Sequence, residues 1–166
     1  YMLNCAAAVD RALQGASASE THSPAAAWAG VLAEEVQYWC RRCASTHASS
    51  ILLRTGLLQL QTTAASAAQG EAASLSADDV AAAGEAVATL AYSGDLEPGL
   101  VGVVDVLLRR RLRGAVAREV LQSYSQVYDA AVRCAGDSGT ALRLAPADLA
   151  ALLGIADQAA GSPGSP

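Results

Sequence analysis

Four cysteines provide the most reactive side chains of this 166-residue chain. Cys40 and Cys43 are three residues apart, while Cys5 and Cys134 lie far from them on either side in the sequence. Thiols in such numbers serve in redox pairs, metal centres or disulfide bridges. Apolar residues recur around each cysteine at three- and four-residue steps, which predicts that all four thiols lie on the apolar faces of helices.

A redox role is considered first because the motif from Trp39 to Cys43, Trp-Cys-Arg-Arg-Cys, is similar to the thioredoxin active site. That chemistry needs the first cysteine at a helix N-terminus, where the helix dipole and free N–H groups lower its pKa. About four turns of predicted helix precede Cys40, and no strand leads into it. The position of the motif therefore argues against redox chemistry.

A metal site is the second interpretation. Cys40, Cys43 and His47 follow one another at i, i+3 and i+7, which clusters them on one helix face. Such ligands suit zinc, with Cys5 or Cys134 as a fourth ligand. Structural zinc sites usually contain two closely spaced ligand pairs, however, and the chain has one.

Disulfide bridges are the third interpretation and the leading prediction. An even number of cysteines on three predicted helices can form two bridges, and four cysteines allow three connectivities. A Cys40–Cys43 bridge within a helix would need distorted geometry, so we expect Cys5 and Cys134 to pair with Cys40 and Cys43. Such bridges typically contribute about 2–4 kcal/mol and imply an oxidising compartment. The remaining alternative is four free thiols that behave as small buried hydrophobic side chains.

The composition predicts an all-α domain. The chain is 52% hydrophobic, only 4% aromatic and devoid of Phe, and an Ala- and Leu-rich core is typical of closely packed helices. All 11 basic residues are Arg, which fits a GC-rich genome. No strand or hairpin pattern occurs.

The periodicity predicts a single domain of about six or seven helices over 1–160, stapled by disulfides, with a Gly/Ser/Pro linker at 161–166. Ser76 and Gly94 are the predicted ends of one helix, and Gly114 is a predicted kink. The stretch 45–50 is either a break or a polar turn of one long helix. The predicted helices are 2–14, 24–43, 51–69, 77–92, 98–112, 116–134 and 146–156.

Charge and motifs restrict the function. The net charge of −5 makes nucleic acid an unlikely partner, and no apolar run is long enough to insert into a membrane. No nucleophile-elbow, P-loop or dinucleotide-binding motif occurs, so we predict no cofactor and no enzyme. The basic run is either a solvated helix end or a docking patch for an acidic neighbour; it comprises Arg109, Arg110, Arg111 and Arg113.

One stretch resembles a known family. A Leu-Ser-Ala-Asp-Asp-Val start at 75–80 is followed by Leu90 and then by Val103-Val104 and Leu107-Leu108. Over about 51–112, this pattern resembles the helical stalk of polycystin-type and adhesion-receptor ectodomains, the GAIN/REJ-like regions. The β-sandwich and cleavage motif of the complete domain are missing, so the resemblance implies a cell-surface or extracellular spacer without autoproteolysis.

These observations predict a non-catalytic structural or interaction domain of a larger extracellular or cell-surface protein. It would act as a rigid helical spacer or docking module that contacts neighbouring chains or domains in an assembly. The alternative is an intracellular or organellar helical adaptor with reduced cysteines, with zinc binding as an option. A helical-bundle enzyme is the third class, for which Glu34, Glu35, His47 and the tyrosines are the available residues.

Overall fold

The computed structural model describes residues 4–5, 8–9, 11–12, 24–68, 75–94, 96, 100–135 and 142–155. From Pro24 onward, five helices occur in these ranges and no strand does, which confirms the all-α prediction. The predicted linker at 161–166, the helix start at Pro98 and most of the helix at 2–14 lie outside the described residues. The helices are α2 (Pro24–Arg54), α3 (Leu57–Ala68), α4 (Ala77–Ser93), α5 (Val106–Ala135) and α6 (Pro146–Leu152).

The α2 helix is longer than the helix predicted over 24–43. It passes through 45–50 without a break, so this stretch is a polar turn of one long helix. The chain breaks instead after Arg54, where Gly56 has a φ of 76°. The buried Thr55 hydroxyl donates to the Ile51 carbonyl oxygen at 2.9 Å, and Gly56 supplies the left-handed conformation that separates α2 from α3.

The α5 helix is one reason why the described ranges contain fewer helices than the six or seven predicted. Two helices, 98–112 and 116–134, were predicted on either side of a kink at Gly114, but α5 is one helix that begins at Val106. Asp105 sets that start, because its Oδ1 atom accepts from the Leu108 N–H at 2.8 Å as an N-cap does. Leu112 and Val116 are both buried next to Gly114, so core packing outweighs the low helix propensity of glycine.

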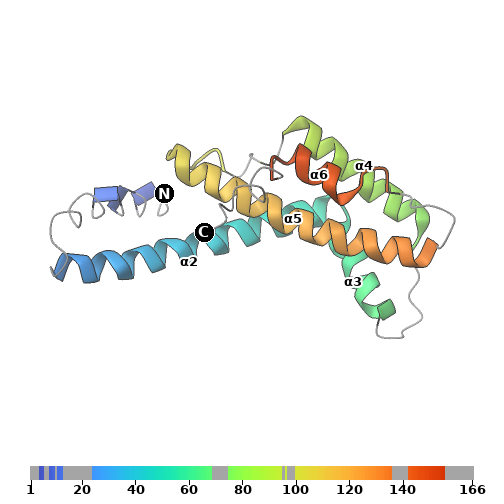
Figure 1. Ribbon diagram of the computed structural model, residues 1–166, viewed down its shortest axis with the longest axis horizontal. Helices are drawn as coiled ribbons and strands as arrows, with labels where there is room; N and C mark the ends of the chain where they lie inside the picture. The colour runs from blue at the N-terminus through green and yellow to red at the C-terminus, as the bar shows by residue number, and fades with distance from the viewer. Residues whose placement is uncertain are drawn as a thin grey trace, which may run out of the picture.

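The core lies mainly between α2 and α5, which run side by side in the same direction (Figure 1). Arg111 near the start of α5 lies close to Cys40 of α2. Further along, Gln61 of α3 donates to Gln126 of α5 at 2.5 Å. Both helices contribute fully buried aliphatic side chains to this contact, including Ala48, Ile51, Val116, Val120 and Val127.

The α6 helix packs against α5, and α4 packs against α6 and α3 (Figure 1). Ser76 caps α4 by accepting from the Asp79 N–H at 3.4 Å, and Gly94 ends it with a φ of 68°, as predicted. The α6 helix begins at Pro146 as predicted. Gly84 of α4 leaves room for Leu142, whose Cδ2 atom lies only 2.6 Å from where a Cβ atom would stand.

Candidate functional site

The N-terminal part of α2, residues 24–42, is here called the α2 arm. It extends beyond the start of α5 in Figure 1, and the first buried side chain described in α2 is Ala44. Trp28, Val31, Tyr38 and Trp39 are 67%, 54%, 48% and 38% exposed. At 3.6 residues per turn these four side chains lie on the side of α2 opposite to the buried Ala44, Ala48 and Ile51, so they face away from the core.

An aromatic cluster marks the C-terminal half of the arm. The rings of Tyr38 and Trp39 meet edge to face, with centroids 5.6 Å apart and an interplanar angle of 77°. Arg42 donates to the Tyr38 hydroxyl oxygen at 3.3 Å, and its guanidinium lies 5.8 Å from the centre of the Trp39 ring. These contacts hold three large side chains together at the surface.

A shallow hollow of about 610 Å³ adjoins this cluster. Its walls come from the last turns of the arm, the following turn of α2 and one residue of α5. The exposed Ser45 and Thr46 are small, so the hollow opens where the bulky side chains of the arm end. The lining residues are Tyr38, Arg41, Arg42, Ser45, Thr46 and Glu119.

The cysteines are all free thiols in the structure. Cys134 lies 23 residues beyond Arg111 on α5, which is about 35 Å along a helix. Arg111 lies near Cys40, whereas bridged cysteines need Cα atoms within about 7 Å. The predicted bridge from Cys134 to Cys40 or Cys43 is therefore wrong, and Cys5, which is exposed, is also unpaired.

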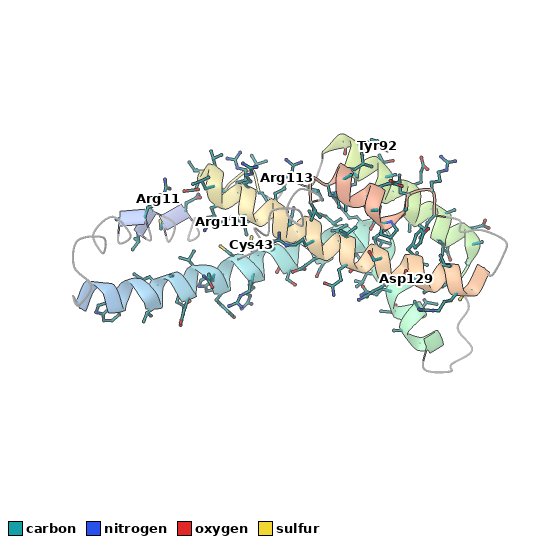
Figure 2. All side chains as sticks on the ribbon, viewed as in Figure 1. Arg11, Cys43, Tyr92, Arg111, Arg113 and Asp129 are labelled. Carbon is teal, nitrogen blue, oxygen red and sulfur yellow. The ribbon has the colours of Figure 1, made fainter. Side chains whose placement is uncertain are left out.

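The Cys40–Cys43 pair has the environment of packed thiols. Both side chains are half-buried and pack against the core, and Figure 2 shows Cys43 on the side of α2 that faces the start of α5. Burial raises the pKa of Cys40, the Cys43 thiol raises it further, and Arg111 partly opposes both effects. A raised pKa disfavours the thiolate that redox chemistry needs, in agreement with the position of Cys40 in the middle of α2.

The predicted zinc ligands are not assembled. The His47 Nε2 atom lies 3.3 Å from the Leu96 carbonyl oxygen, so this ring nitrogen is used in a contact with the core. Within the ranges that the structure describes, no three His, Cys, Asp or Glu side chains converge as a metal site requires. The set of Cys40, Cys43 and His47 therefore lacks the geometry of a metal centre.

The basic run on α5 is divided between two roles. Arg109 donates from Nε and Nη2 to the Val103 carbonyl oxygen, at 2.9 and 2.6 Å, and thereby closes the turn before α5. Arg110 and Arg111 are exposed, and Arg113 is half-buried. The predicted docking patch thus retains two exposed guanidinium groups, beside exposed aliphatic residues at Val101, Val104, Val106 and Leu107.

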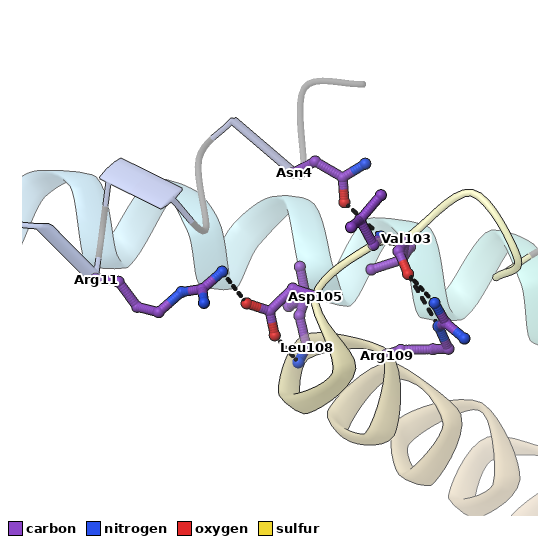
Figure 3. Close-up of polar contacts among 7 residues, drawn as sticks. Asn4, Arg11, Val103, Asp105, Leu108 and Arg109 are labelled. Carbon is purple, nitrogen blue, oxygen red and sulfur yellow. Dashed lines mark hydrogen bonds and ion pairs between the residues drawn. The ribbon is translucent and has the colours of Figure 1, made fainter.

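A polar contact ties the N-terminal residues to this same region (Figure 3). Asn4 donates to the Gly102 carbonyl oxygen and accepts from the Val104 N–H, both at 2.9 Å. Arg11 forms an ion pair with Asp105. The Leu108 N–H and the Arg11 charge lower the pKa of Asp105. Sequence reasoning missed this contact because its two sides are about a hundred residues apart and carry no shared motif.

Comparison with known proteins identified no relative of this chain. No protein-family model matches this chain, and no curated protein or solved structure matches it either. The resemblance to receptor stalk regions therefore remains a prediction. Of the helices in the described ranges, none combines the length and the apolar character needed to cross a bilayer.

Proposed function

We propose that this chain is a non-catalytic docking module of a larger protein and that the α2 arm is its contact surface. The observation that carries the proposal is the exposure of Trp28, Val31, Tyr38 and Trp39 on one helix. Exposed aromatic residues that lie beside arginine are typical of protein interfaces, where they supply much of the binding energy. Large apolar and aromatic side chains that are exposed together on one helix face mark an interaction site.

The rest of the fold serves as a rigid support for the arm. Because α2 is continuous from Pro24 to Arg54, the arm and the buried part of the helix share one backbone. Ala44, Ala48 and Ile51 anchor that buried part in the core. A partner on the arm would be held in a fixed orientation to α5, as a spacer or docking role requires.

Two settings are proposed for this module. An extracellular or cell-surface setting is supported by the resemblance of 51–112 to receptor stalk regions. The four free thiols favour the alternative, an intracellular or organellar adaptor with reduced cysteines. Non-reducing peptide mapping of protein from its natural source distinguishes the two, because a disulfide between any of these cysteines would exclude the reduced adaptor.

Hydroxyl-radical footprinting tests the docking role. The chain has two tryptophans, and both belong to the arm, so their oxidation rates report on this surface. We expect Trp28 and Trp39 to be protected in protein from its natural source relative to the purified 166-residue chain at a dilution at which it is monomeric. Tyr92, which is 69% exposed on α4, is the control and should react equally in both. Equal oxidation of the tryptophans in both samples would overturn the proposal.

A further inference from the structure

The charges of the α2 arm are arranged around its aromatic cluster. Glu34 and Glu35 precede Tyr38 and Trp39, and Arg41 and Arg42 follow them; all four charged side chains are exposed. Ion pairs within a helix form between residues three or four apart, but these acids and bases are six to eight apart. Accordingly, no ion pair between described residues uses any of the four.

The size of the exposed side chains changes along the same face. Trp28 and Val31 are large and lie at the N-terminal end of the face, whereas Ser45, Thr46 and Ser49 are small and lie at its C-terminal end. The hollow of about 610 Å³ opens at this second end. One end of the face therefore projects, and the other end is recessed.

Two such faces complement each other only when their helices run in opposite directions. With Tyr38 and Trp39 at the centre, Glu34 and Glu35 of each copy lie opposite Arg41 and Arg42 of the other. The same alignment places Trp28 and Val31 over the hollow of the second copy. Parallel helices would instead oppose like charges and stack large residues on large ones.

We propose that this chain forms a two-fold symmetric dimer through antiparallel pairing of its α2 arms. The occupant of the docking surface is thus a second copy of the chain, and the inference rests on the proposed docking role of the arm. A two-fold interface is self-complementary, so each Glu–Arg contact occurs twice. The aromatic cluster lies at its centre, where residues that dominate binding are normally found.

Charge exchange between two variants tests whether the dimer forms through the charged residues of the arms. One variant carries Glu34→Arg and Glu35→Arg, and the other carries Arg41→Glu and Arg42→Glu. Each variant opposes like charges throughout an antiparallel dimer, so we expect the dissociation constant to rise at least about tenfold for each alone. An equimolar mixture restores opposite charges and should form a heterodimer.

The measurement is sedimentation velocity over a range of concentrations, with reductant present because the four thiols are free. Arg54→Glu on α2 and Asp129→Arg on α5 are matched controls, since both residues are exposed and lie outside the arm; both variants should dimerise like the wild type. Circular dichroism checks that every variant remains helical. Tryptophan emission of the wild type should shift to shorter wavelength as the dimer forms.

Three outcomes would overturn the dimer. In the first, the wild-type chain stays monomeric up to its solubility limit. In the second, each variant alone dimerises as tightly as the wild type. In the third, the mixture of the two variants stays monomeric although each variant is folded. A monomeric chain whose arm is nonetheless protected in protein from its natural source would reject self-pairing and leave the docking role intact. A heterodimer that forms only on mixing would establish that the charged residues of the two arms face each other in the dimer.

Discussion

At the scale of single residues, Tyr124 is the largest fully buried side chain among the described residues and brings a polar group into an aliphatic core. Its ring is 1% exposed, and its hydroxyl donates to the Leu144 carbonyl oxygen at 2.8 Å. The bond joins α5 to the segment that precedes α6. Burial is the main cause that raises the pKa of Tyr124 to about 12, followed by the neighbouring Tyr128.

We predict that Tyr124→Phe lowers the free energy of unfolding by about 1–2 kcal/mol, because the Leu144 carbonyl loses its partner in a partly buried position. Urea denaturation followed by circular dichroism measures the change. Tyr92→Phe is the matched control at an exposed site and should change stability by less than about 0.5 kcal/mol. Equal effects of the two substitutions would contradict the assigned role of the Leu144 bond.

The raised pKa of Tyr124 also predicts a loss of stability in alkali. The folded state holds the phenol neutral, whereas in the unfolded chain it ionises at about pH 10. Its contribution is therefore fully present below pH 10 and is lost as the pH rises towards the folded pKa of about 12. The stability difference between wild type and Tyr124→Phe should shrink over this range. A constant difference would show that Tyr124 ionises alike in both states.

The lowered pKa of Asp105 predicts a loss of stability in acid, opposite to the effect of Tyr124. The folded state lowers its pKa, mainly through the Leu108 N–H and then through Arg11, so its charge stabilises the fold above the unfolded pKa of about 4. That stability is lost as the pH falls through the lower folded value. Asp105→Asn keeps a capping oxygen without the charge. We expect Asp105→Asn to be less stable than wild type at neutral pH, and the two unfolding free energies to converge in acid. Asp129→Asn is the control and should match the wild type in stability at neutral pH.

We predict that the cysteine thiols fall into two classes of reactivity. Cys5 and Cys134 are exposed, while Cys40 is half-buried and has a raised pKa. With an aromatic disulfide reagent at neutral pH, Cys5 and Cys134 should react rapidly and Cys40 slowly, because the thiolate is the reactive form. Mass spectrometry of quenched samples assigns each site. Rapid labelling of Cys40 in the folded chain would contradict its placement against α5.

At the scale of helices, substitutions at two glycines separate the effect of helix propensity from the effect of side-chain packing. A Cβ atom at Gly30 in α2 would meet no atom within 4 Å, whereas at Gly84 in α4 it would lie 2.6 Å from a methyl group of Leu142. We predict that Gly30→Ala stabilises the fold by about 0.5–1 kcal/mol. Gly84→Ala should destabilise it by about 1 kcal/mol, because overpacking exceeds the gain in helix propensity. Thermal unfolding of the two variants measures these changes. The prediction would be refuted if both substitutions changed the stability in the same direction.

The helix ends could be predicted wherever the signal was local. Ser76, Gly94 and Pro146 act within one turn of the backbone, and each marks the predicted boundary. Gly114 carries an equally local signal, but buried neighbours on both sides keep α5 continuous. Tertiary packing cannot be inferred from the residues near Gly114, so one helix was predicted as two.

The candidate site was less predictable for a related reason. The spacing of the apolar residues correctly indicates a helix over the arm, but spacing does not reveal that Trp28, Val31 and Trp39 face away from the core. The cysteine prediction failed similarly, because the direction of α5 relative to α2 decides how far Cys134 lies from Cys40. Both properties depend on the arrangement of whole helices.

At the scale of the whole molecule, α2 should have two levels of backbone protection. Its residues from Ala44 to Leu52 include several buried side chains, whereas the described arm has none. We predict faster hydrogen exchange in 28–39 than in 44–54 at low protein concentration, since local opening is easiest where few apolar contacts are lost. Peptides from α5 provide the protected reference. Uniform protection along α2 in a dilute sample would contradict an uncovered arm.

The parallel direction of α2 and α5 has a consequence for the newly made chain. Parallel helices cannot be joined by a short turn, and here α3, α4 and the residues up to Asp105 all lie between them. The inward face of α2 around Ala48 and Ile51 therefore leaves the ribosome well before α5 exists to cover it. We expect nascent chains that end before Val106 to aggregate or to recruit chaperones, because their apolar surface has no partner until synthesis reaches the end of α5.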